Sequence, residues 1–97
     1  MLTPELLYSI LDKVLHEARL RWKEAWVTRI KIGSGKIFVY MIVGENATNV
    51  KVIIYRSKVK VRVYTKLKGL AIALQRIFER EYERALRMRE HEREESI

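Results

Sequence analysis

Apolar and polar residues in the middle of the chain form four strand-like runs, at residues 26–32, 36–43, 50–56 and 59–65. Apolar and polar residues alternate most regularly from Val59 to Tyr64, whereas Ile37–Val43 is apolar throughout. Short runs rich in β-branched and aromatic residues, bounded by turn residues, predict strands. Tight-turn residues at 33–35 and at Ser57-Lys58 predict two hairpins, which we expect to join through residues 44–49.

The turns predict which side chains share a face of the sheet. One face should be mainly aliphatic and hold Trp26, Thr28, Ile30, Ile32, Ile37, Val39, Met41, Val43, Val52, Ile54, Val61 and Val63. The other should hold Val27, Arg29, Lys31, Phe38, Tyr40, Ile42, Lys51, Ile53, Tyr55, Lys60, Arg62 and Tyr64. In the second hairpin, a Ser57-Lys58 turn pairs Tyr55 with Lys60 and Ile53 with Arg62. On this second face aromatic residues lie toward the middle and cations flank them.

Helical patterns stand on both sides of the strands. Thr3-Pro4-Glu5 is typical of a helix start, with a capping residue followed by proline and an acid. The apolar stripe that follows is Leu7, Leu11, Val14, Ala18, Trp22 and Ala25, widened by Leu6, Ile10 and Leu15. A second stripe holds Leu67, Leu70, Ala71, Leu74, Ile77, Phe78, Tyr82, Ala85 and Leu86.

These elements predict an α+β fold in the order α-β-β-β-β-α. A four-stranded antiparallel meander would carry the N- and C-terminal helices on its aliphatic face. We expect residues 1–86 to form one domain, and residues 87–97 a charged helical extension or a frayed tail. A short coiled coil is an alternative for the second helix, because Ala71, Leu74, Phe78, Tyr82 and Ala85 approximate a heptad seam.

The net charge is concentrated in the predicted sheet. The chain of 97 residues has a formal charge of +8, while residues 1–25 and residues 67–97 each balance their charges. Residues 26–66 contain nine lysines and arginines against one acid, Glu45. A local positive potential of this kind attracts polyanions. The alternative explanation is that lysines on strands deter edge-to-edge aggregation.

The basic and aromatic face therefore predicts a small nucleic-acid-binding protein, DNA- or RNA-binding and acting as a homodimer. The expected contact residues are Arg29, Lys31, Phe38, Tyr40, Lys51, Tyr55, Lys60, Arg62 and Tyr64. Cations would meet phosphates, and aromatic rings would stack on bases.

The sequence leaves two other structural roles open for this face. Its apolar members are typical of an interface, so it could join two copies of a structural or adaptor protein, such as a viral or plasmid accessory factor. Alternatively, the C-terminal helix could cross over and bury it.

The sequence contains no motif that identifies a reaction. There is no cysteine, no HExxH, no P-loop and no glycine-rich dinucleotide turn, so we expect no metal, no cofactor and no catalytic residue. A metal-free ribonuclease acting through lysine, arginine and tyrosine is the one enzymatic alternative. No signal peptide or membrane-spanning run is visible, and we expect a cytoplasmic protein without membrane partners. The composition, rich in Arg, Glu and Lys, is thermophile-like.

Overall fold

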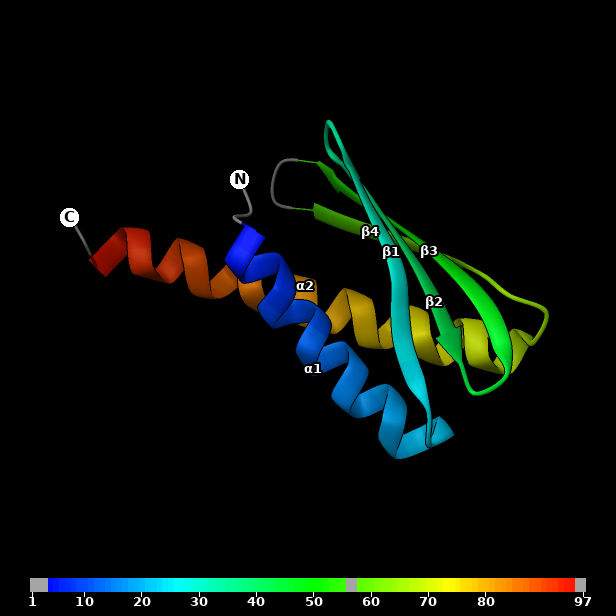
Figure 1. Cartoon of the computed structure of the whole chain (residues 1–97). Helices are drawn as coiled ribbons and strands as arrows, with labels where there is room; N and C mark the ends of the chain where they lie inside the picture. Colours follow the sequence, from blue (N-terminus) through cyan, green and yellow to red (C-terminus); the bar gives the residue numbers. More distant parts are fainter. Residues whose placement is uncertain (1–3, 56–57, 96–97) are drawn as a thin grey trace.

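The computed structural model is a two-layer α+β domain in the predicted element order. It describes residues 4–55 and 58–95, with side chains for 5–54 and 58–88. The elements are α1 (Pro4–Trp22), β1 (Ala25–Gly33), β2 (Lys36–Val43), β3 (Asn46–Tyr55), β4 (Lys58–Tyr64) and α2 (Lys68–Glu95). The strands form one antiparallel sheet in the order β1-β2-β3-β4. Both helices lie along the same side of the sheet (Figure 1).

Helix α1 ends in a tight corner that redirects the chain into β1. Lys23 has a φ of 64°, in the left-handed region, and the Glu24 N–H donates to the Trp22 carbonyl at 2.7 Å. Arg19 Nε donates to the Ala25 carbonyl at 2.9 Å and ties the helix to the first strand residue. The helix begins at Pro4, as predicted, while the capping role of Thr3 lies outside the described residues.

The first two connections are two-residue turns with glycine in the left-handed region. Gly33 pairs with Lys36 around Ser34-Gly35, and Gly35 has a φ of 68°. Val43 pairs with Asn46 around Gly44-Glu45, and Gly44 has a φ of 62°. The expected loop over residues 44–49 is therefore wrong, because residues 46–49 continue the ladder as the start of β3.

A bulge in β1 overturns part of the predicted facing. The register shifts between Val27 and Arg29, so Thr28 is an extra residue on this strand. One extra residue reverses the alternation that precedes it. Val27 therefore lies opposite Met41 in the core, and Trp26 lies opposite Ile42 on the other face. The sequence-based placement of Trp26 and Val27 was wrong, whereas that of Ile30 and Ile32 was right.

The second hairpin has the predicted facing in a different register. Tyr55 pairs with Lys58, Ile54 with Val59 and Val52 with Val61. Lys58 thus belongs to β4 and not to the turn, and every predicted pair slips by two residues. A slip of two preserves the facing, because side chains alternate with a period of two.

The core lies between the helices and the aliphatic side of the sheet. We call this side the inner face: Ala25, Val27, Ile30, Ile32, Ile37, Val39, Met41, Val43, Thr48, Val50, Val52, Ile54, Val59, Val61 and Val63. The helices contribute the buried residues Leu7, Ile10, Leu11, Val14, Ala18, Leu70, Leu74, Ile77, Phe78 and Tyr82. Burying one large apolar side chain contributes about 1.5–3 kcal/mol, so this layer supplies most of the stabilisation.

Helix α2 packs its apolar stripe inward and continues past the sheet toward the C-terminus (Figure 1). Leu74, Phe78 and Tyr82 are buried in the core of this one chain, so the coiled-coil alternative for this seam is wrong. Leu67 precedes the helix and is exposed. The prediction for residues 87–97 falls largely outside the described side chains. Over the described residues, neither helix is long and apolar enough to cross a membrane.

Candidate nucleic-acid interface

No described element of the chain covers the side of the sheet that faces away from both helices. We call it the outer face: Trp26, Arg29, Lys31, Lys36, Phe38, Tyr40, Ile42, Ala47, Asn49, Lys51, Ile53, Lys58, Lys60, Arg62 and Tyr64. Each of these described side chains is at least partly exposed. The alternative in which α2 crosses over and buries this face is therefore wrong, because α2 contributes to the core on the inner face.

Cross-strand pairing gathers most of the predicted site residues into two neighbouring rows. One row runs Lys31, Phe38, Lys51, Arg62 across β1 to β4. The next runs Arg29, Tyr40, Asn49, Tyr64. Residues directly opposite on adjacent strands are close enough for their side chains to interact. In each row, an aromatic ring of β2 therefore lies between a basic residue of β1 and a basic or polar residue of β3.

Lys51 and Phe38 make a contact on this face that joins a cation to an aromatic ring. Lys51 Nζ lies 5.9 Å from the centroid of the Phe38 ring, within the range of a cation–π interaction. Both side chains are half-buried by their neighbours on the sheet. The ammonium group is thus held over the middle of the outer face and not directed past its edge.

All the charged residues of the outer face are positively charged. Its cations are Arg29, Lys31, Lys36, Lys51, Lys58, Lys60 and Arg62, and none of the four strands contains an aspartate or glutamate. Protection of sheet edges explains cations on β1 and β4, which are the edge strands. It does not explain Lys36 and Lys51, which belong to the interior strands β2 and β3.

The structure unites eight of the nine predicted contact residues on this one face; Tyr55 is the ninth, and its side chain lies outside the described ones. Sequence reasoning missed Trp26, which is 44% exposed beside Ile42. Trp26 was missed because no sequence pattern marks the bulge at Thr28, whose Oγ1 donates to the Tyr40 carbonyl at 3.1 Å. Lys58 was missed because it was placed in the turn.

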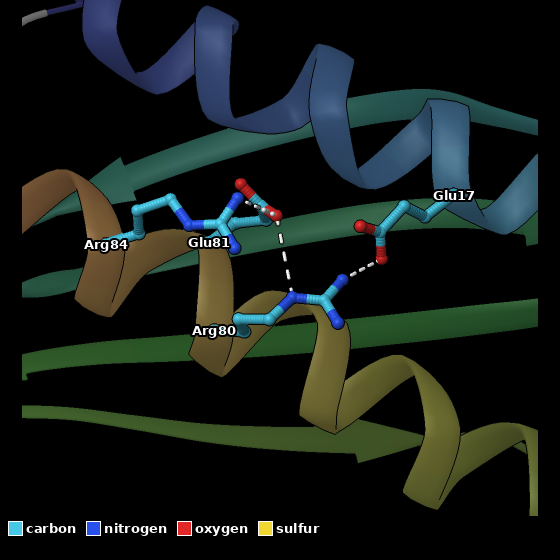
Figure 2. Close-up of polar contacts among 4 residues, drawn as sticks. All are labelled: Glu17, Arg80, Glu81 and Arg84. Atoms are coloured by element: carbon cyan, nitrogen blue, oxygen red, sulfur yellow. Dashed lines mark hydrogen bonds and ion pairs between the residues drawn. The ribbon is translucent and has the colours of Figure 1, made fainter.

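The other polar cluster lies between the two helices and is structural. Figure 2 shows Arg80 of α2 reaching Glu17 of α1, with Glu81 between Arg80 and Arg84. Glu81 is only 3% exposed, and its Oε1 lies 3.6 Å from Arg80 Nε and 3.5 Å from an Arg84 guanidinium nitrogen. These pairs satisfy the charge of a buried carboxylate, which would be costly if left alone.

Two shallow hollows flank this cluster. One, of about 300 Å³, is lined by Asp12, Lys13, His16, Glu17, Glu81 and Arg84. The other, of about 320 Å³, is lined by Arg21, Gly69, Ile72, Ala73, Arg76, Ile77 and Arg80. Within the described part of the chain, no group of three or more His, Asp or Glu side chains is placed to hold a metal ion.

Tyr82 is the tyrosine least suited to contact a ligand. It is fully buried in the core and stacks with Phe78 at a centroid distance of 6.4 Å. Burial raises the pKa of the Tyr82 hydroxyl well above its usual value. This hydroxyl has no hydrogen-bond partner among the described residues, and it lies on the helix side of the sheet.

No family model, curated protein or solved structure matches this chain. The chemistry of the outer face is therefore what bears on the function of this chain.

Proposed function

We propose that this chain is a small nucleic-acid-binding protein that contacts its ligand with the outer face, without catalysing a reaction on it. The observation that carries the proposal is the presence of cations on the interior strands of an uncovered sheet face that has no acid. Lys51 is the clearest case, because it lies over Phe38 in the middle of this face. Phosphates are the ligand groups that such a surface favours.

The apolar part of the outer face supports the proposal as well. Phe38, Tyr40, Ile42 and Ile53 are half-buried and adjoin one another on β2 and β3. A solvated face has no need of these side chains, and contiguous apolar patches mark binding surfaces. Nucleic acids combine phosphates with flat apolar bases, so they match both components of the face.

A homodimer formed through the outer face is the second candidate, favoured by the same apolar side chains. Stacking two copies would place the cations of one copy against those of the other, with no acid on either face to offset them. Such juxtaposition of like charges at an interface costs several kcal/mol. For this reason we place nucleic acid ahead of a second copy as the occupant. Light scattering over a range of protein concentrations tests for a dimer through any surface.

The test of the proposed function is fluorescence anisotropy with labelled DNA and RNA, titrated across salt concentration. We expect a log–log slope of affinity against salt of about −3 to −5, which corresponds to about four to six phosphate contacts. The cations of the outer face are numerous enough to make that number of phosphate contacts. Absence of binding at about 100 mM salt, where a site with several phosphate contacts still registers, would refute the proposal.

A further inference from the structure

The outer face is too wide to enter a groove of duplex DNA. It consists of four strands, so its backbone alone spans three inter-strand spacings, or about 14–15 Å. The major groove is about 12 Å wide and admits a helix or a two-stranded ribbon. A DNA duplex that keeps its B form could therefore meet this face only through its phosphates, and the aromatic residues in the middle would have no base to stack on.

A single strand, in contrast, can use those aromatic residues. Phe38 and Tyr40 are two residues apart on β2 and point to the same side, about 6.5–7 Å apart along the strand. Both are partly exposed, so part of each ring is accessible. Bases of an unpaired strand can be splayed apart and stacked individually on aromatic side chains.

Cations stand beside both rings on the same neighbouring strand. Lys31 of β1 is directly opposite Phe38, and Arg29 of β1 is directly opposite Tyr40. On the other side, Lys51 is opposite Phe38, but Asn49 is opposite Tyr40. Of the two neighbouring strands, only β1 has a cation opposite each of the two rings. Two successive phosphates can therefore both be paired with a cation on the β1 side.

We propose, building on the nucleic-acid function above, that the outer face selects single-stranded nucleic acid. Two neighbouring bases stack on Phe38 and Tyr40, while Arg29 and Lys31 hold their phosphates. Tyr64, which is 53% exposed in the same row as Tyr40, provides a stacking surface for a further base.

The experiment compares a single strand of about 12 nucleotides with a duplex of the same length by anisotropy at about 100 mM salt. We expect the single strand to bind at least tenfold more tightly. A duplex bound equally well or better would overturn the selection for single strands and leave the nucleic-acid function standing. Failure to bind either one would refute the nucleic-acid function, and this inference with it.

A variant and its matched control test the role of the rings. Phe38→Leu with Tyr40→Leu keeps apolar side chains but removes both aromatic surfaces. Stacking contributes about 1–3 kcal/mol per base, so we expect single-strand affinity to fall at least tenfold while duplex affinity stays within about twofold.

Tyr8→Leu removes an exposed aromatic ring from α1, away from the outer face, and we expect it to leave both affinities unchanged. Equal losses in the aromatic double variant and in this control would contradict stacking. The strand preference of the unaltered chain stands as a test even if the aromatic variant does not fold.

Discussion

Lys51 lies directly opposite Phe38 on adjacent interior strands, and its ammonium nitrogen is 5.9 Å from the centre of the Phe38 ring. A lysine side chain usually extends into water. Here the ring holds it over the middle of the sheet, where the interaction contributes about 0.5–1 kcal/mol at an exposed site. The charge of Lys51 is thereby kept where a ligand lying across the outer face meets it.

Lys51→Met keeps most of the length of the side chain and removes its charge. If Lys51 contacts a phosphate, the salt slope of binding should become shallower by about 1. The free energy of unfolding should change by about 1 kcal/mol or less, since only one partly exposed cation–π contact is lost. Salt-titrated anisotropy and urea denaturation measure the two quantities. An unchanged salt slope would remove Lys51 from the interface.

Deleting Thr28 should be little more damaging than replacing it. Without this extra residue, β1 can form a regular ladder that keeps Val27 opposite Met41 and leaves Trp26 on the outer face. Deletion and Thr28→Val both lose one exposed hydrogen bond, so each should cost about 1 kcal/mol or less. Urea denaturation of the two variants measures the cost. A much larger loss of stability on deletion would contradict the register of β1.

Tyr82→Phe should stabilise the protein at neutral pH. The Tyr82 hydroxyl is buried without a partner among the described residues, and such a group costs about 1–3 kcal/mol. We therefore expect the free energy of unfolding to rise by about 1 kcal/mol or more. A loss of stability in the variant would mean that the hydroxyl is well solvated or hydrogen-bonded.

The same substitution should also change the response to alkaline pH. Burial raises the pKa of Tyr82 in the folded state, so the unfolded chain loses this proton first, near pH 10. The stability that Tyr82 contributes is complete below that pH and falls as pH rises further, by up to about 1.4 kcal/mol per pH unit. The advantage of Tyr82→Phe over the parent should accordingly widen above pH 10 in urea melts. A constant difference would argue against a buried hydroxyl.

RNA should remain intact when incubated with the protein in the presence of EDTA. The described side chains of the outer face can position a phosphate, but they include no histidine, aspartate or glutamate to act as a general base. Gel analysis of labelled RNA over hours measures the outcome, with Lys60→Glu/Arg62→Glu protein as the control for contaminating nucleases. Cleavage that the control lacks would establish the metal-free ribonuclease alternative.

The element order and most of the facing could be predicted from local signals. Ser34-Gly35 turned out to be the first turn, and the period of two placed Phe38, Tyr40 and Lys51 on the outer face. The prediction even withstood a wrong register in the second hairpin, because an error of two residues leaves every side chain on its side.

The wrong predictions concern features that depend on a single residue or on tertiary packing. The bulge at Thr28 is one residue long and has no composition of its own, so the placement of Trp26 and Val27 was reversed. The loop at 44–49 was misjudged because Asn46 and Asn49 resemble turn residues, although both pair across the ladder. Burial of Glu81 follows from the arginines around it, which no helical stripe indicates.

The central claim is that the outer face, and not positive charge in general, binds nucleic acid. Lys60→Glu with Arg62→Glu reverses two exposed charges on β4 of this face. Arg21→Glu with Arg76→Glu reverses the same number of exposed charges beside a hollow of the helical layer. Both variants should melt cooperatively, and both have the same net charge.

Anisotropy with labelled nucleic acid at about 100 mM salt, applied to these two variants and the parent, tests the claim most directly. We predict that binding is abolished in Lys60→Glu/Arg62→Glu and retained within a fewfold in Arg21→Glu/Arg76→Glu. Retained affinity in the first variant, or an equal loss in both, would contradict the assignment of the outer face.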